Sequence, residues 1–429
     1  MLNAWKRIVA AGTSGLLLFS ALIFTGGGTI NAAEVAGASE PDVFNIVALG
    51  DSITVGYEPG MDLNSKPYGF TERLLEQGWY HGRTSLANYG ILGLTTSGLR
   101  NYTGAVSKGT VITGNEIQVG LADPRIEQLA ANTAQAATDL KAADLITITI
   151  GGNDMSTLFK NFKELTAEDF QLQLDQRLTE YTANMKATLE NIRAINPKVT
   201  ILLADQYQPA PRIYLTSNYL KLMDAAARLT ATVDNVAASM AKEDAVVQVV
   251  HVAESFAGKE GGLTYVVKSP IDKIDIHPTQ SGYELIARVF AELLWGEYRT
   301  PAVAVMNPSA APMSIVVKGV ELNTPNKPIL KSGQNFLALK DVLNAVGATG
   351  KWDNKTSSAT IVYGGRTVII TIGSKVIKVN GQKVAIDTPA FLQKVGKEDK
   401  TYLPLAALAS GLGFDVKYSA QLRTAFINP

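Results

Sequence analysis

Between Phe44 and Tyr298, short apolar runs alternate with amphipathic stretches, and this alternation limits the folds that are open to the chain. The apolar runs are rich in Val, Ile and Leu and carry few charges, as strands buried on both faces do. The stretches between them have helical spacing. This alternation predicts a parallel sheet covered by helices on both faces. The predicted strands are Phe44–Leu49, Leu86–Tyr89, Leu145–Ile150, Val199–Ala204 and Val246–Val250, and the clearest helical stretches are Asp169–Ile195, Tyr219–Lys242 and the residues after Pro278.

The length and composition suit two folded domains and exclude several kinds of site. The chain has 429 residues, of which 46% are hydrophobic and 18% charged. It carries 39 basic and 39 acidic residues, so the basic excess typical of a nucleic-acid binder is missing. The absence of cysteine excludes disulfides, thiolate zinc sites and a cysteine nucleophile. With only 3 histidines, we expect no metal centre and no cofactor.

The N-terminus has the pattern of an export signal. Lys6 and Arg7 precede an apolar run from Ile8 to Phe24, and small residues follow it. An uncleaved membrane anchor is the alternative, but the run is slightly short and rich in glycine for a spanning helix. We therefore expect residues 1–33 to be a signal peptide and the protein to be secreted, with envelope association left open.

Polar residues that could carry chemistry follow two of the predicted strands. Ser52 follows the first strand, and Asn153 follows the third within a Gly-Gly-Asn-Asp sequence. Ligands of open α/β sheets bind at the carboxyl ends of the strands, so a serine there could be a nucleophile and an asparagine a hydrogen-bond donor. Each could instead be an ordinary helix cap.

Two further segments are predicted at the same edge of the sheet. A glycine-bearing loop, Asn88–Thr96, follows the second strand, and could be a simple chain reversal. His277 lies just before the last helix of this domain, where it could be a general base with a nearby carboxylate holding its tautomer, or merely a cap or surface residue. His81 and His251 have no motif around them, so we expect them to be structural or surface residues.

The order of these four segments resembles the SGNH, or GDSL, family of serine esterases and lipases over about residues 42–298. The resemblance implies a three-layer α/β/α, flavodoxin-like fold with a five-stranded parallel sheet. It makes Ser52 the nucleophile and His277 the base. It also implies an oxyanion hole formed by the backbone N–H groups of Ser52 and Gly93 and the side chain of Asn153, with Gly90 as the competitor for the glycine role.

One feature departs from the family pattern. The acid usually lies three residues before the histidine, but that position holds Ile274. Asp275 lies two residues before His277 and Asp272 five before; either could reach the imidazole, or the pair Ser-His could work without an acid. We favour Asp275.

Other acidic residues and motifs are assigned no catalytic role. We expect Asp51 and Asp154 to order their loops by accepting hydrogen bonds from backbone amides. The chain has no Gly-x-Ser-x-Gly elbow, since Thr54 stands where its last glycine would be.

The leading hypothesis is a secreted serine hydrolase that cleaves carboxylic esters through a Ser-His(-Asp) acyl-enzyme mechanism. The substrate could be a short-chain ester, a lipid ester or an O-acetylated glycan, and a lysophospholipase or thioesterase differs only in the acyl group. The alternative is a non-catalytic envelope- or polysaccharide-binding protein with a vestigial hydrolase domain. We expect the loops Glu58–Tyr68 and Gly104–Pro124 to decide which acyl group is accepted.

A second domain follows a proline-bearing linker over residues 299–313. Short β-type runs dominate residues 314–429, and Asn380-Gly381 predicts a hairpin turn. The segment also contains a repeat, because Phe336–Leu339 matches Tyr402–Leu405 and Gly347 matches Gly413 at the same offset. Two β–helix–β units predict a small α+β domain built by duplication.

This segment resembles the copper amine oxidase N-terminal-like domain, an accessory module of secreted proteins from Gram-positive bacteria. The segment contains no His and no Cys, so we expect no copper site and no catalysis. The resemblance favours contact with the envelope or a polysaccharide. Trp352, Tyr402 and Tyr418 could stack on sugars, but because Trp352 and Tyr418 occupy matching repeat positions we expect all three in the core.

Overall fold

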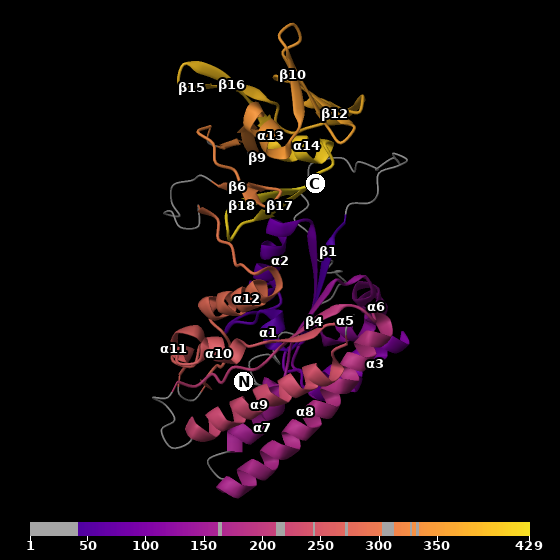
Figure 1. Cartoon of the computed structure of the whole chain (residues 1–429), viewed down its shortest axis with the longest axis vertical. Helices are drawn as coiled ribbons and strands as arrows, with labels where there is room; N and C mark the ends of the chain where they lie inside the picture. The colour runs from indigo at the N-terminus through magenta and orange to yellow at the C-terminus, as the bar shows by residue number, and fades with distance from the viewer. Residues whose placement is uncertain are drawn as a thin grey trace, which may run out of the picture. The chain divides into compact units, whose positions relative to one another are not determined.

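The chain folds into two compact units, shown in Figure 1. The computed structural model describes residues 42–161, 165–211, 219–242, 245–270, 273–302, 313–326, 328–331 and 334–429. One unit comprises residues 43–78 and 84–299, and the other includes residues 79–83 and 300–429. The predicted signal peptide and most of the predicted linker lie outside the described residues. In the parts that are described, no helix combines the length and apolar character needed to cross a bilayer.

The first unit is built on a sheet of five parallel strands. Their order is β2-β1-β3-β4-β5, which is the flavodoxin-like order predicted for this domain. The central strand β3 is buried at every residue, whereas the edge strands β2 and β5 have partly exposed positions because a neighbour covers only one side of each. The strands are β1 (Phe44–Gly50), β2 (Thr84–Gly90), β3 (Leu145–Thr149), β4 (Thr200–Ala204) and β5 (Val247–Val250).

Helices cover both faces of this sheet. Successive residues of a strand point to opposite faces, and so Val47 and Leu49 of β1 enter one core while Ile46 enters the other. The first core includes residues of α3 to α9, and the second includes residues of α1, α2, α10 and α12. The helices are α1 (Ser52–Val55), α2 (Phe70–His81), α3 (Thr96–Lys108), α4 (Gly114–Ile117), α5 (Ile126–Ala131), α6 (Thr133–Ala142), α7 (Gly152–Asn161), α8 (Ala167–Ile195), α9 (Tyr219–Met240), α10 (Val252–Phe256), α11 (Glu260–Leu263) and α12 (Gln280–Trp295).

Side-chain caps set the helix limits that position the site. Helix α8 begins two residues before the predicted start, because the Thr166 hydroxyl accepts a hydrogen bond from the backbone N–H of Asp169. Thr279 caps α12 in the same way, through the N–H of Gly282. His277 therefore lies two residues before the cap of a long helix that is packed into the second core.

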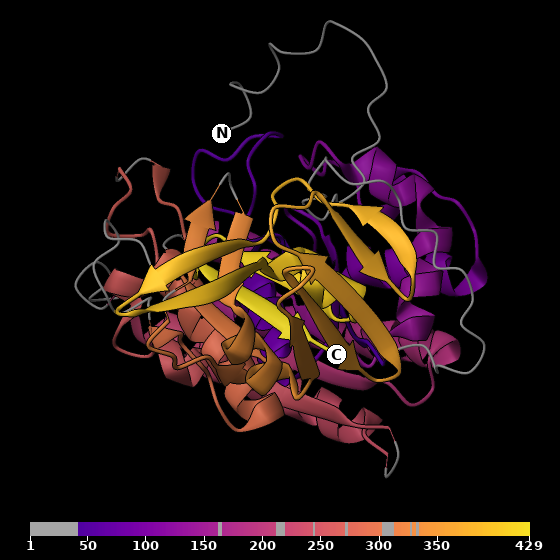
Figure 2. The same ribbon diagram turned by 90° about the horizontal axis from the view of Figure 1, so that it is seen from above.

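The second unit consists mainly of antiparallel sheets, and Figure 2 shows its strands in orange to yellow. Two strand–helix–strand units repeat in it, β9-α13-β10 and β16-α14-β17, as the sequence repeat predicts. The sheets have the orders β10-β11-β12-β13-β14, β15-β16-β9-β8 and β17-β18-β6-β7. The elements are β6 (Ser314–Val317), β7 (Val320–Glu321), β8 (Ile329–Lys331), β9 (Gln334–Ala338), α13 (Leu339–Val346), β10 (Thr349–Asp353), β11 (Ser358–Tyr363), β12 (Arg366–Thr371), β13 (Val376–Val379), β14 (Gln382–Ala385), β15 (Phe391–Val395), β16 (Glu398–Pro404), α14 (Leu405–Gly411), β17 (Asp415–Ser419) and β18 (Thr424–Asn428).

One turn prediction in this unit is confirmed and one core prediction is wrong in part. Asn380 and Gly381 both have positive φ and join β13 to β14, as a two-residue hairpin turn requires. Tyr402 is buried, but Trp352 and Tyr418 are 36% and 51% exposed. These two residues lie on β10 and β17, which are edge strands of their sheets and are therefore less covered by the rest of the unit.

Candidate active site

Ser52 lies at the carboxyl end of β1, in a turn that leaves little freedom to the backbone. Gly50 has φ +142°, and a Cβ there would lie 2.1 Å from the carbonyl oxygen of Thr149, so only glycine fits. Oδ1 of Asp51 accepts a hydrogen bond from the N–H of Ile53 at 3.0 Å, which caps the short helix α1. The expectation that Asp51 orders this loop is confirmed.

The structure brings Ser52, His277 and Asp275 together in one line of hydrogen bonds. Nε2 of His277 lies 2.8 Å from the Ser52 hydroxyl, and Nδ1 lies 2.8 Å from Oδ1 of Asp275. The same Oδ1 accepts the backbone N–H of His277 at 2.9 Å. Asp272 lies outside the described residues, and the side chain of Ile274 is exposed. Among the described acids, Asp275 is thus the one that contacts the imidazole.

The segment that carries His277 is held from several sides. Its carbonyl oxygen accepts the N–H of Tyr265 at 2.9 Å, and the preceding carbonyl accepts the hydroxyl of Tyr207 at 3.0 Å. The ring of Tyr57 meets the imidazole edge-on, with 4.6 Å between the ring centroids. No sequence motif points to these tyrosines, because their contacts depend on strands and loops distant in the chain.

The two ends of the loop between α1 and α2 contact each other, and the loop forms hydrogen bonds with the segment around His277. A Cβ on Gly69 would lie 2.6 Å from Cα of Gly56, so the two ends of the loop touch backbone to backbone. Within the loop, Glu58 accepts the hydroxyl of Tyr265 at 2.7 Å and the side-chain amide of Gln280 at 2.5 Å. This loop, predicted to affect the choice of acyl group, is thereby fixed beside His277.

Gly93 and Asn153 lie side by side at the same edge of the sheet. Nδ2 of Asn153 donates to the carbonyl of Leu94 at 2.9 Å, which places the amide against the residue that follows Gly93. Gly93 has φ +80°, and a Cβ there would meet only Leu121, at 3.7 Å. Within the described parts of the chain, the N–H groups of Ser52 and Gly93 donate to no other protein atom. Two backbone donors therefore remain available to an oxyanion.

Gly90, the competitor for the glycine role, has a different task. Its N–H already donates to Oδ1 of Asn88 at 2.9 Å. A Cβ at this position would lie 2.6 Å from the backbone nitrogen of Val55, so Gly90 lets β2 approach α1. The geometry favours Gly93 as the donor.

An ion pair between buried Asp123 and partly exposed Arg125 supports the Gly93 loop, and the sequence reasoning missed it. Oδ2 of Asp123 accepts the N–H of Leu92 at 2.8 Å and pairs with Arg125 at 2.7 Å. Arg125 also donates to the carbonyl of Gly90 at 3.0 Å. An Asp-Pro-Arg sequence in a long connection carries no recognisable signal, because its partners lie about 30 residues earlier in the chain.

Burial and hydrogen bonding move the pKa values of the site's carboxyl groups in opposite directions. Burial raises the pKa of Asp51 to about 7, against the opposing hydrogen bond from Ile53. Burial also raises the pKa of Asp154, which accepts the N–H and hydroxyl of Thr96. The predicted hydrogen bond from a backbone amide is present, but Asp154 lies in α7 and holds the start of α3 rather than a loop of its own. Burial acts in the same direction on Asp275, but the hydrogen bond and charge of His277 hold its pKa below the usual value. Asp275 is therefore the ionised partner that the imidazole needs.

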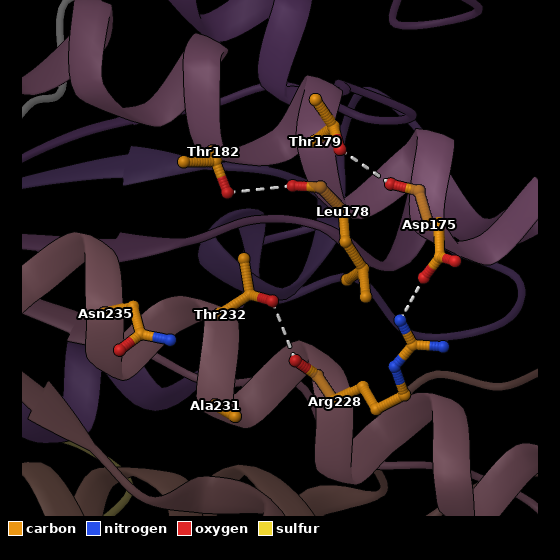
Figure 3. A pocket seen from close by; sticks show the side chains of 8 residues that line it. All are labelled: Asp175, Leu178, Thr179, Thr182, Arg228, Ala231, Thr232 and Asn235. Atoms are coloured by element: carbon orange, nitrogen blue, oxygen red, sulfur yellow. Dashed lines mark hydrogen bonds and ion pairs between the residues drawn. The ribbon is translucent and has the colours of Figure 1, made fainter.

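A separate hollow lies between α8 and α9, and none of the predicted site residues lines it (Figure 3). The hydroxyls of Thr179, Thr182 and Thr232 each donate to a carbonyl one turn earlier in their own helix, and Asp175 pairs with Arg228. The three hydroxyls and the two charged groups of this hollow are thus already paired within the two helices. In the described residues, no group of three or more His, Asp or Glu side chains is arranged to hold a metal ion.

The two remaining histidines lie outside the Ser52 site, as expected. His81 is the last residue of α2 and is exposed. His251 follows β5, and its half-exposed side chain lies 3.5 Å from Asp205 and 3.8 Å from Asp234.

Two family models match the chain. Residues 46–290 match the GDSL-like Lipase/Acylhydrolase model, which is more than half of the chain. Residues 316–427 match the model of the copper amine oxidase N-terminal domain. A search of the curated proteins finds no match.

Solved structures of esterases and lipases are similar to part of the chain. A lipase from a goat rumen metagenome is 23% identical with a TM-score of 0.38, over 58% of this chain and 95% of that chain. A catalytic mutant of an acetylxylan esterase from Geobacillus stearothermophilus is 16% identical with a TM-score of 0.38, over 59% and 95% of the two chains. A carbohydrate esterase family 3 protein from Talaromyces cellulolyticus is 12% identical with a TM-score of 0.32, over 58% and 96%.

Proposed function

Because the chain belongs to the GDSL-like lipase/acylhydrolase family and is therefore a carboxylic ester hydrolase, we propose that it works through an acyl-enzyme formed on Ser52. The observation that carries the proposal is the pair of 2.8 Å contacts that join Ser52 to His277 and His277 to Asp275. This is the relation of nucleophile, base and orienting acid that serine hydrolysis needs.

In the acylation step, Nε2 of His277 takes the hydroxyl proton while Oγ of Ser52 bonds to the ester carbonyl carbon. The tetrahedral intermediate collapses, and the bond to the alcohol oxygen breaks. His277 returns the proton to that oxygen, so the alcohol leaves neutral. Asp275 accepts a hydrogen bond from Nδ1–H throughout, without taking the proton, and stabilises the imidazolium that forms in between.

In the deacylation step, His277 takes a proton from water while the water oxygen bonds to the acyl carbon. The bond to Ser52 breaks, Ser52 regains its proton from His277, and the carboxylic acid leaves. In both steps the N–H groups of Ser52 and Gly93 and the side chain of Asn153 hold the oxyanion. Each donor of this kind contributes about 3 kcal/mol to lowering the barrier.

A fluorophosphonate probe tests the assignment of the nucleophile. We expect the probe to label the full mature chain and to label Ser52→Ala not at all, because Oγ of Ser52 is the atom that the probe phosphonylates. Ser255→Ala is the matched control, since Ser255 lies on α10 outside the site and should leave labelling unchanged. Labelling of folded Ser52→Ala at the wild-type level would refute the assignment.

A substrate panel then defines the ester class within the proposal. It should compare acetylated sugars, short-chain esters, phospholipids and thioesters on wild type and Ser52→Ala. We expect at least one class to be hydrolysed by wild type alone. The vestigial alternative depended on the missing acid at Ile274, and the contact of Asp275 with His277 removes that support.

We also propose that the chain is exported and that residues 1–33 are removed on the way. The support is the charged, apolar and small-residue order of the N-terminus. Expression in a Gram-positive host and N-terminal sequencing of the protein from the medium test this directly. Recovery of the chain only inside the cells, with Met1 retained, would contradict it.

A further inference from the structure

The zero net charge of the whole chain hides two oppositely charged parts. Residues 43–299 carry 22 basic and 29 acidic residues, whereas residues 313–429 carry 15 basic and 7 acidic ones. Of those 15 basic residues, 13 are lysines. A concentrated positive charge in one domain indicates an anionic partner. Neutrality of the entire sequence is therefore no argument against such a partner.

Three of these lysines form one row across the five-stranded sheet of the second unit. The register pairs Lys351 with Thr360, Thr360 with Ile369, Ile369 with Lys378, and Lys378 with Lys383. Paired residues project from the same face of a sheet, and neighbouring strands lie about 5 Å apart. The row therefore runs from strand β10 to strand β14 on one face, which we call the lysine face.

The lysine face is the solvent side of this sheet. Ile361, Val368 and Ile377, each one position from a member of the row, are buried in the core. The three lysines are exposed. The other outward positions on these strands are held by Thr349, Asp353, Ser358, Val362, Thr367, Thr371, Val376 and Ala385.

The positive charge of the lysine face is compensated by the protein only in part, through the interaction of Lys351 with Asp353. Asp353 is the one carboxylate at an outward position of the described strands β10 to β14, and it accepts hydrogen bonds from the Lys355 N–H and the Thr356 hydroxyl. Within the described chain, none of the three lysines forms a salt bridge. Lys378 and Lys383 stand directly opposite each other, which destabilises a sheet unless an anion lies between them.

We propose that the lysine face binds a linear acidic polysaccharide, with carboxylates on the lysines and hydroxyls on the threonines between and beside them. A polymer with regularly spaced carboxylates can contact several members of the row at once, which strengthens weak single contacts. Nucleic acid fits less well. The outward positions carry no aromatic side chain on which a base could stack and no arginine to grip a phosphate with two hydrogen bonds.

The test is binding of the full mature chain to immobilised polygalacturonate, with neutral dextran and double-stranded DNA as the other surfaces. We expect binding to polygalacturonate, weak or no binding to dextran, and a fall in affinity as salt rises, because exposed charges are screened. The triple variant Lys351→Gln, Lys378→Gln, Lys383→Gln should bind polygalacturonate at least about tenfold more weakly.

The matched control is Lys340→Gln, Lys394→Gln, Lys397→Gln, which removes the same charge from exposed positions outside the five-stranded sheet. It should bind within about twofold of wild type. An equal loss in both triple variants would overturn the proposal in favour of net charge alone. DNA binding as tight as polygalacturonate binding would overturn the proposal in favour of a nucleic-acid partner. Dextran binding as tight as polygalacturonate binding would overturn it by showing that the carboxylates of the polysaccharide are not needed.

Ester hydrolysis enters this experiment only as a check of folding. Both triple variants should hydrolyse a small soluble ester at the wild-type rate, since no lysine changed belongs to the Ser52 site. Failure of the lysine face would leave the esterase proposal standing. Conversely, if the fluorophosphonate probe failed to label Ser52 in wild type, the proposal of polysaccharide binding would still stand.

Discussion

Oδ1 of Asp275 accepts the backbone N–H of His277 and also lies 2.8 Å from Nδ1 of the same residue. One carboxylate oxygen thus fixes the backbone and the ring of a residue only two positions later. This short spacing, which departs from the family pattern, still presents Nε2 to Ser52 at 2.8 Å. The tight turn between Asp275 and His277 therefore lets an acid two residues away reach Nδ1 of the imidazole.

The first prediction concerns this acid. Asp275→Asn should lower kcat by about 10²–10⁴-fold, because an amide can hold the ring in the wrong tautomer and cannot stabilise the imidazolium. Steady-state kinetics on the best ester of the panel measures the effect. Asp272→Asn, a change three residues earlier, is the control and should keep kcat within about twofold. The assignment is wrong if Asp272→Asn is the damaging change and Asp275→Asn is harmless.

The second prediction separates the two candidate glycines. Gly93→Ala should reduce kcat while costing only about 1 kcal/mol of stability, since a Cβ finds space but the positive φ is strained. Gly90→Ala should instead cost about 1–3 kcal/mol of stability, because its Cβ collides with the backbone of Val55. Urea unfolding and kinetics on both variants test this. The opposite pattern would make Gly90 the oxyanion donor.

The third prediction concerns Asn153. Asn153→Ala should lower kcat by about 10²–10³-fold with little change in KM, because its amide acts on the oxyanion rather than on the bound ester. Asn101→Ala is the matched control, since Asn101 also donates its side-chain amide to a backbone carbonyl, that of Ile117. We expect the control to lose about 1 kcal/mol of stability and no activity. Equal kinetic losses in both variants would assign Asn153 a structural role only.

The fourth prediction follows from the pKa of Asp51, which burial raises from 3.8 to about 7. Between these two values the folded chain holds a proton that the unfolded chain has lost, so stability falls as pH rises from about 4 to about 7. Asp51→Asn keeps an oxygen to accept the N–H of Ile53 but cannot titrate.

The measurement is the free energy of unfolding of wild type and Asp51→Asn between pH 4.5 and pH 8. We expect the free energy of unfolding of the variant to rise relative to that of wild type as pH rises. The relative gain should be a few kcal/mol at most, with no further change above about pH 8. A difference between the two proteins that stays constant over this range would show that Asp51 is ionised throughout.

The sequence predicted the sheet, because five short runs of Val, Ile and Leu that alternate with amphipathic stretches are typical of strands buried between helices. It also placed Ser52, Asn153 and His277 at one edge, since the carboxyl ends of parallel strands share an edge. It left the acid open, because spacing alone does not tell whether a side chain two or five residues away reaches a ring. Only the turn at Asp275 decides this.

The parts that escaped prediction depend on contacts between distant segments. Asp123 and Arg125 support the Gly93 loop, and Tyr57 packs on His277, through geometry that no local pattern encodes. The repeat predicts Trp352 and Tyr418 in the core, but a repeated position on the edge strand of a small sheet is not covered by its neighbours. Burial in such a domain depends on the whole assembly of strands.

The meeting of Gly56 and Gly69 has a consequence for how such a chain can diversify. Insertions or deletions among residues 58–68 would change the surface beside His277. The contact between Gly56 and Gly69 would meanwhile keep α1 and α2 in place. A preference for a different acyl group could therefore arise from a change in the length of this one loop, without any change at Ser52 or His277. Grafting this stretch between relatives offers a route to altered selectivity that spares the catalytic framework.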